Sequence, residues 1–97
     1  MRTVEWSPKA EADYYAIIDY LLKKWSLREA QHFIDQVYDI EIILKQGNAD
    51  FKKASYRNIR IATLSKHISI LYLILSKKRV KLIHIWDNRQ NPSNLYK

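Results

Sequence analysis

The sequence predicts an α+β fold in which a helix hairpin packs on one face of a small antiparallel sheet, in the order β-α-α-β-β-β. Apolar residues recur at helical spacing from Tyr14 to Leu44, and a period of two replaces that spacing from Tyr56 to Trp86. The length of 97 residues suffices for one hydrophobic core but not for two. We therefore expect a single domain over residues 1–97.

The first helix has a clear start. Residues Arg2–Trp6 are predicted to form a short strand at an edge of the sheet. Ser7 and Pro8 come directly after this strand. A serine can cap the first free amides of a helix, and proline fits the first turn because its missing N–H costs nothing there. The predicted helix is Ser7–Trp25. It should bury a stripe formed by Tyr14, Ile17, Ile18, Leu21, Leu22 and Trp25.

A second helix is predicted over Ser26–Gln46. Ser26 and Glu29 have the spacing of a capping box. Gly47, the only glycine, stands where a left-handed residue usually ends a helix. The two helices should form a tight antiparallel hairpin.

Three strands are predicted in the second half of the chain, over Tyr56–Thr63, His67–Leu75 and Val80–Trp86. Ser76–Arg79 should form the hairpin turn between the last two strands. Residues 48–53 are interpreted as a polar connection. The helix hairpin can cover only one face of this sheet, so the other face should be free to bind a partner and should carry part of the basic half.

The charge is uneven along the chain. Lys and Arg number 17 against 10 Asp and Glu, which gives a formal charge of +7, and residues 51–97 contain a single acidic residue, Asp87. Such an excess favours polyanions or acidic proteins as partners. The alternative is that the lysines only keep the surface soluble. The candidate binding residues are Lys52, Lys53, Arg57, Arg60, His67 and Arg89.

The chain contains no cysteine, which excludes disulfides and thiolate metal sites and fits a reducing compartment. No apolar run approaches the roughly 18 residues that cross a bilayer, and the N-terminus lacks the apolar core of a signal peptide. We expect a cytoplasmic protein with no membrane contact, no metal and no cofactor.

The end of the chain is its most informative stretch. The apolar run Val80–Ile85 stops abruptly in Trp86–Pro92, which includes Arg89. This pattern places a fixed cation at a sheet edge, where binding and catalytic groups are often found. The alternative is that Asp87-Asn88 and Asn91-Pro92 merely end the strand and turn the chain.

The element order, the helix opening Trp6–Ala10 and the ending Ile85–Pro92 together resemble the RelE/ParE family of type II toxins, over nearly the whole chain. The resemblance implies a toxin that is neutralised by a cognate antitoxin in a hetero-oligomer and that contacts operator DNA only through the antitoxin. RelE-like members cut mRNA in the ribosomal A site without a metal, using cations and proton-transfer groups around the phosphate. ParE-like members instead inhibit DNA gyrase and lack that set of residues.

By this resemblance Arg89 stands where the nuclease branch has its C-terminal arginine, and Tyr96 falls close to that branch's terminal tyrosine. Arg57 and Arg60 lie on a strand where basic residues usually occur. However, nuclease members typically begin the next strand with Arg-Leu-Val-Tyr, and this chain has Ser69-Ile70-Leu71-Tyr72. Ser69 therefore replaces a central arginine.

Two histidines could transfer protons. His67 shares the strand face of Ser69 and could there supply a proton-transfer group. The alternative is that His67 is an ordinary residue at a strand start. By simple alternation His84 shares a face with Leu82 and Trp86. If that face meets the helices, His84 is a core residue. If that face is open, His84 is a catalytic candidate.

We favour a ParE-like toxin that inhibits gyrase or another protein. The alternative is a metal-independent endoribonuclease, whose candidate catalytic residues are Arg60, His84, Arg89 and Tyr96. A third possibility is a basic module that binds nucleic acid without toxicity.

Overall fold

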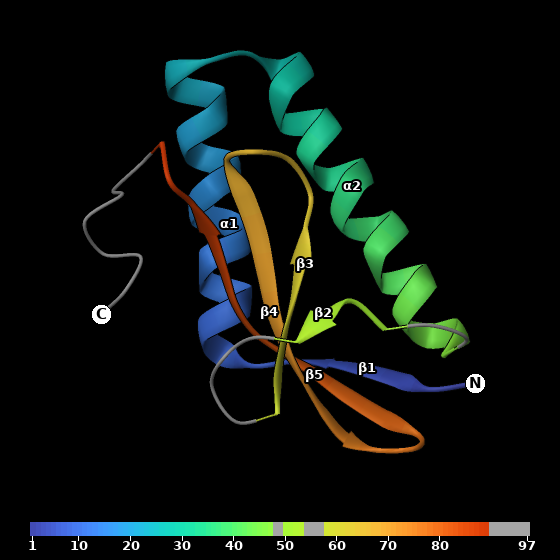
Figure 1. Cartoon of the computed structure of the whole chain (residues 1–97). Coiled ribbons are helices and arrows are strands. Elements are labelled where there is room, and N and C mark those ends of the chain that lie inside the picture. Colours follow the sequence, from blue (N-terminus) through green and yellow to red (C-terminus); the bar gives the residue numbers. More distant parts are fainter. Residues whose placement is uncertain (48–49, 54–57, 90–97) are drawn as a thin grey trace.

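The computed structural model describes residues 1–47, 50–53 and 58–89, and it shows two helices packed on a five-stranded mixed sheet (Figure 1). The strands lie in the order β1-β5-β4-β3-β2, so β4 is central. The predicted α+β class and helix hairpin are confirmed. In chain order the elements are β1 (Thr3–Trp6), α1 (Pro8–Lys24), α2 (Leu27–Gln46), β2 (Lys52–Lys53), β3 (Ile59–Thr63), β4 (Ile68–Ser76) and β5 (Arg79–Asp87).

Both helices begin at the predicted caps. The hydroxyl of Ser7 accepts a hydrogen bond from the Ala10 amide at 3.0 Å, and that of Ser26 accepts one from the Glu29 amide at 3.1 Å. Gly47 ends α2 in the left-handed region with φ 70°, which favours glycine because other residues adopt it at a cost. In the part of the chain that the structure describes, neither helix has the length and apolarity to cross a membrane.

The predicted apolar stripe of α1 is only partly buried. Ile17 and Leu21 are almost fully buried, whereas Leu22 is 47% exposed and Trp25 is 53% exposed. Figure 1 shows the reason, because the helix hairpin extends past the end of the sheet and its last turn has no strand beneath it. The expectation that Leu22 and Trp25 are buried was wrong.

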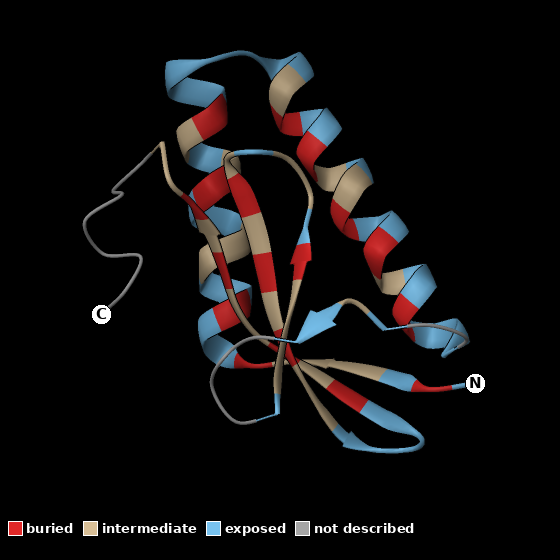
Figure 2. Ribbon diagram, in the orientation of Figure 1, coloured by how far each residue is buried: buried red, intermediate tan, exposed pale blue. Residues whose placement is uncertain are grey.

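The core lies between the helices and one face of the sheet. Buried and half-buried residues alternate along β4 from Ile68 to Leu73, and the strand ends in exposed residues, as Figure 2 shows. This is the pattern of a strand with one covered face. The largest fully buried side chains are Tyr72, Phe33, Ile17, Leu21, Leu44, Ile70, Leu82 and Ile85.

The sheet edges differ from each other. β1 pairs in parallel with β5, with Val4 opposite Val80, and so confirms the predicted edge strand. At the other edge β2 is a two-residue strand that was not predicted, and its two lysines suit an exposed edge because charge opposes pairing with other chains.

β3 begins at Ile59, later than the predicted strand, since Asn58 lies in a turn and residues 54–57 lie outside the described part.

Arg2 joins the chain start to the end of α2. Its Nε donates to the Leu44 carbonyl at 2.9 Å, and its Nη2 lies 2.8 Å from Asp50 Oδ1. The Tyr72 hydroxyl also donates to Asp50, at 3.2 Å, and accepts from the Phe51 amide at 2.9 Å. This network fixes β1, α2, the segment before β2, and β4 relative to one another.

Candidate functional site

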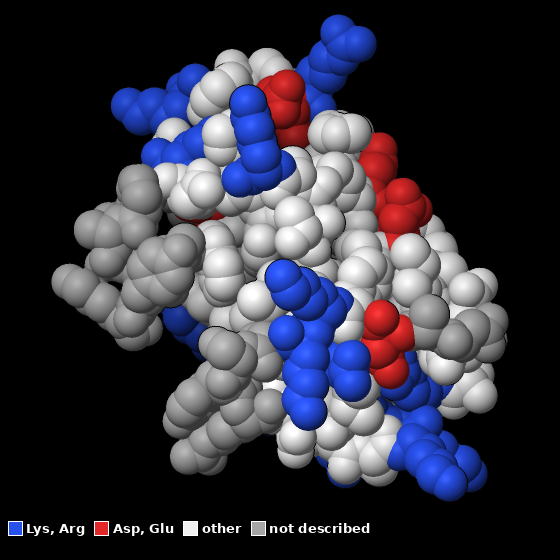
Figure 3. All heavy atoms as spheres, in the orientation of Figure 1, with Lys and Arg blue, Asp and Glu red and all other residues white. Residues whose placement is uncertain are grey.

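The face of the sheet away from the helices is apolar at its centre. Ile59, Ile61, Leu71 and Leu73 form two cross-strand pairs between β3 and β4, and all four are half-buried although no helix covers them. Figure 3 shows this face, with uncharged surface in the middle and Lys and Arg gathered above and below it. The expected free face exists, and most of its cations lie above and below the apolar centre, although Lys81 lies beside that centre, opposite Leu73.

A β-bulge decides which residues of β5 reach this open face. His84 lies opposite Leu71 and Leu82 lies opposite Tyr72, so Ile83 is an extra residue without a partner on β4. The side chains before and after a bulge change their alternation. Leu82 and Ile85 are therefore buried in the core, while His84 and Trp86 are half-buried on the other face. The expectation that His84 shares the face of Leu82 was wrong for this reason.

His84 is held from the side by α1. Its Nδ1 lies 2.5 Å from Asp13 Oδ2, and the same carboxylate accepts from the Ile85 amide at 3.0 Å. Lys9 also contacts Asp13, at 2.8 Å. The His84 ring packs near Trp86, with centroids 5.5 Å apart. With the proton on Nδ1, Nε2 would remain as an acceptor, which is the arrangement that a general base requires.

Arg60 lies on β3, next to the edge strand β2, and its side chain is on the helix side of the sheet. It is paired with the fully buried Tyr72, and paired residues point to the same face. Its Nη1 donates to the Phe51 carbonyl at 3.0 Å. A small hollow of about 230 Å³ is lined by Arg60 together with Lys53, Asn58 and Ile74. Lys52 and Lys53 are both exposed beside it.

Arg89 lies at the opposite end of the sheet and is neutralised there. Its Nη2 lies 2.8 Å from Oδ2 of Asp87, whose side chain is fully buried, and Asp87 also accepts from the Arg89 amide at 2.9 Å. The hydrogen bonds to Asp87 raise the pKa of Arg89 above its usual value, although burial opposes this shift. The guanidinium carbon lies 4.8 Å from the centre of the Trp25 ring. Arg89 is thus oriented by two residues rather than freely presented.

His67 contacts the same end of the sheet. Its Nδ1 lies 3.2 Å from Oδ1 of Asn88, and its carbonyl accepts from the Asn88 amide at 2.9 Å. The contact holds the β3–β4 loop against the residue that follows β5. His67 precedes β4, which starts at Ile68 rather than at the predicted His67.

Two of the predicted catalytic residues, Arg60 and Arg89, lie far apart. Arg60 faces the helix side beside Tyr72, whereas Arg89 follows Asp87, which pairs with Ile68. Those two positions on β4 are four residues, or about 13 Å, apart. Arg57 and Tyr96 lie outside the described residues. Ser69, opposite Trp86 on the open face, occupies the position where the resemblance implies an arginine.

The side-chain partners of His84 and Arg89 were not predicted from the sequence: Asp13 for His84, and Asp87 and Trp25 for Arg89. Asp87 stands two residues before Arg89, a spacing that could have suggested the pair. Asp13 and Trp25 meet their partners only through the packing of α1. Among the described residues, no three His, Asp or Glu side chains gather as a metal site would require.

Comparison with known proteins identifies the family. The family model described as the ParE toxin of the parDE type II toxin-antitoxin system matches residues 4–92. The chain belongs to the ParE toxin family. This finding confirms the resemblance to RelE/ParE toxins. No curated protein matches the chain.

Solved structures similar to this ParE toxin domain show the same fold. A chain from the chromosomal ParDE system of P. aeruginosa is 23% identical, with a TM-score of 0.67, covering 90% of this chain and 96% of that one. A copper-bound mutant toxin from Helicobacter pylori is 11% identical, with a TM-score of 0.66 and coverages of 94% and 99%. A chain of the E. coli DinJ-YafQ toxin-antitoxin complex is 11% identical, with a TM-score of 0.62 and coverages of 93% and 96%.

Proposed function

We propose that this ParE toxin acts in the cytoplasm by binding DNA gyrase, and that it does not cut RNA. The observation that supports this is the dispersal of the candidate nuclease groups. RNA cleavage by attack of a 2′-OH requires cations at the phosphate and proton-transfer groups on either side of it. Here Arg60 faces the helix side, Arg89 is neutralised by Asp87, and Ser69 offers no charge on the open face.

The test compares the two targets directly. Purified toxin is added to a gyrase supercoiling assay and, separately, to a translation reaction with labelled mRNA. We expect inhibited supercoiling and intact mRNA. Cut mRNA with unaffected supercoiling would refute the proposal.

One observation favours the alternative endoribonuclease. The Asp13–His84 contact resembles the orientation of a general base, and His84 lies beside the open face. His84→Gln separates the two functions. A gyrase inhibitor should keep its effect on growth in this variant, whereas a nuclease that uses His84 should lose most of it, since general bases typically contribute 10²–10⁴-fold.

We further propose that a cognate antitoxin covers the open face of the sheet. An apolar centre with cations at both ends is complementary to a segment that is apolar and acidic and that becomes ordered on binding. The P. aeruginosa and E. coli structures described above belong to toxin-antitoxin systems, which supports a partner of this kind.

The antitoxin surface can be tested with the product of a short neighbouring reading frame. Opposite charges attract over about 8 Å at physiological salt, so association should slow as salt rises. Lys52→Glu with Lys53→Glu should slow association, whereas the same change at Lys77 and Lys78, in the β4–β5 turn, is the control. Association that is indifferent to both salt and the Lys52/Lys53 change would exclude this surface.

A further inference from the structure

The connection between the two helices forms an exposed apolar tip. Leu22 is 47% exposed, Trp25 is 53% exposed and Leu27 is 74% exposed, and all three lie within six residues. Only Trp25 and Ser26 separate α1 from α2, so these side chains are held by two helix ends rather than by a long loop. We define the hairpin tip as Leu22, Lys23, Lys24, Trp25, Leu27 and Arg28.

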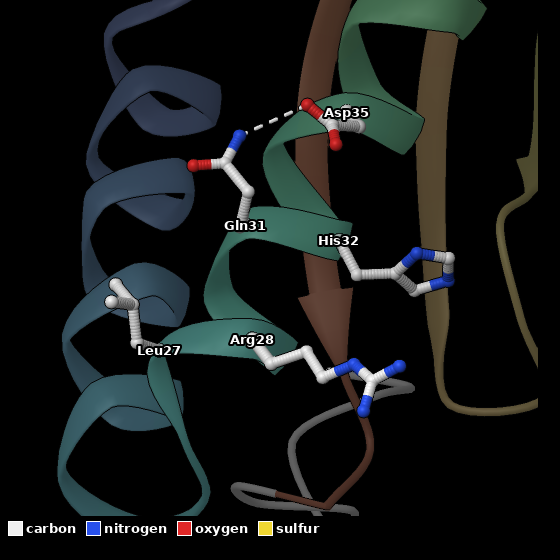
Figure 4. Close-up of a pocket in the computed structure, with 5 residues that line it drawn as sticks. All are labelled: Leu27, Arg28, Gln31, His32 and Asp35. Atoms are coloured by element: carbon white, nitrogen blue, oxygen red, sulfur yellow. Dashed lines mark hydrogen bonds between the residues drawn. The ribbon is translucent and has the colours of Figure 1, made fainter.

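The charges of the hairpin tip all have one sign. Lys23, Lys24 and Arg28 are exposed next to the three apolar side chains. A hollow of about 680 Å³ adjoins the tip on α2, and in Figure 4 Leu27 points to its α1 side whereas Arg28 and His32 point to the other. Gln31 and Asp35, which share a hydrogen bond of 3.0 Å, complete its lining, so the hollow itself is mixed in charge and the basic character belongs to the tip.

Arg89 connects the hairpin tip to the end of β5. Its guanidinium lies 4.8 Å from the centre of the Trp25 ring, and the Tyr20 hydroxyl donates to its carbonyl at 3.4 Å. Asp87 holds the other side of the guanidinium. Arg89 therefore lies directly against Trp25 of the tip, with 14% of its side chain exposed.

The β4–β5 turn provides an internal comparison. It also contains two consecutive lysines, Lys77 and Lys78, and a partly exposed leucine, Leu75, lies next to it near the end of β4. However, this turn has no aromatic residue and no second exposed leucine. A basic turn alone can be explained by solubility, but three exposed apolar side chains cost free energy unless a partner covers them.

We propose that the hairpin tip, with Arg89, is the surface that binds the toxin's protein target, through a target segment that combines carboxylates with apolar side chains. This inference rests on the proposed function, in which inhibition occurs by protein binding. Trp and Arg are the residues that most often dominate the energy of protein interfaces. The carboxylates would pair with Lys23, Lys24 and Arg28, and the apolar side chains would cover Leu22, Trp25 and Leu27.

A protein segment fits this surface better than a nucleic acid does. Base stacking would use the faces of the Trp25 ring, and Arg89 already covers one of them. Leu22 and Leu27, on either side of Trp25, offer apolar contact that a nucleic acid does not need.

The experiment compares matched variants of the two turns. Lys23→Glu with Lys24→Glu and, separately, Leu27→Ser are set against Lys77→Glu with Lys78→Glu and Leu75→Ser. Each full-length protein is assayed for gyrase inhibition, for growth arrest after induction and for antitoxin affinity. The tip variants should lose about tenfold or more in inhibition, which corresponds to about 1.4 kcal/mol of binding free energy. The control variants should stay within about twofold of wild type.

The outcomes separate this inference from the proposed function. If the tip variants inhibit gyrase as well as wild type does, the hairpin tip is not the target surface, while gyrase inhibition stands. If wild type does not inhibit gyrase at all, the proposed function fails instead. An equal loss of antitoxin affinity in the tip variants would assign the tip to the antitoxin and overturn the inference. Binding of single-stranded DNA or RNA that Trp25→Ala abolishes together with toxicity would assign it to nucleic acid.

Discussion

In the described part of the chain, two arginine–aspartate pairs have similar geometry and different reach along the sequence. Arg2 and Asp50 are 48 residues apart, and their closest atoms are 2.8 Å apart. Arg89 and Asp87 are two residues apart, also with closest atoms at 2.8 Å. The first pair includes the Leu44 carbonyl and the Tyr72 hydroxyl, whereas the second orients one side chain against Trp25.

This difference separates stability from function. A pair that joins distant segments is lost when the chain unfolds, so it contributes to the free energy of unfolding. A pair between near neighbours in sequence constrains less of the chain and mainly fixes where a charge lies. We therefore expect Arg2 to matter for folding and Arg89 for toxicity, and substitutions in each pair can test that division.

The largest effect is expected for Arg2→Ala. The Arg2 side chain is 8% exposed, and its removal leaves the Asp50 carboxylate without its cation. Breaking a buried pair on one side costs about 3–5 kcal/mol, and we expect about 3 because Asp50 is partly open to water. Urea unfolding measures this. A loss no larger than that of Arg89→Ala would remove the distinction between the pairs.

Acid should weaken the same pair. The hydrogen bond from Arg2 holds the pKa of Asp50 below its usual value, although burial partly opposes this. A carboxyl whose pKa is lower in the folded state stabilises the fold fully above its unfolded pKa, about 3.9, and loses that contribution as the pH falls through the folded pKa. Urea midpoints of wild type should therefore fall more steeply below about pH 4 than those of Asp50→Asn. Parallel curves would contradict this assignment.

A smaller change in stability but a large change in toxicity is expected for Arg89→Ala. Asp87 keeps its hydrogen bond from the backbone amide of residue 89, although its fully buried carboxylate loses its cation. We expect about 2 kcal/mol in urea unfolding, because a hydrogen bond to a charged group contributes about 1.5–3 kcal/mol. Growth after induction should recover.

Arg89→Lys is the control for that prediction. Lysine keeps the charge but cannot reproduce the two-pronged contact with Asp87, so toxicity should remain low. Killing at the wild-type level by Arg89→Ala would exclude Arg89 from the site.

The smallest effect is expected for the exposed pair Glu5–Arg79, whose closest atoms are 2.6 Å apart. The hydrogen bond from Arg79 lowers the pKa of Glu5. However, both groups face water, where ion pairs contribute little and salt screens them. Glu5→Gln should leave the urea midpoint unchanged at physiological salt. A drop comparable to that of Arg89→Ala would show that reach and burial are not the deciding factors.

The sequence by itself determined both helices with their ends, and the existence of every described strand except β2. Ser7 and Ser26 cap the two helices and Gly47 ends the second, because capping depends on residues within one turn of each other. The turn around Lys77 and Lys78 followed equally from local composition. Family membership was also readable, from the order of these elements and the ending after Trp86.

Only the tertiary structure decided which way the site residues face. The bulge at Ile83 places His84 away from Leu82, and the pairing of Arg60 with Tyr72 turns that arginine to the helix side. Trp25 is exposed because α1 extends past the sheet. Periodicity predicts which face a side chain is on only while the strand stays regular, and it predicts burial only where another element packs against that face. A bulge, a cross-strand register and the end of a sheet depend on residues far apart in the chain, so no local pattern records them.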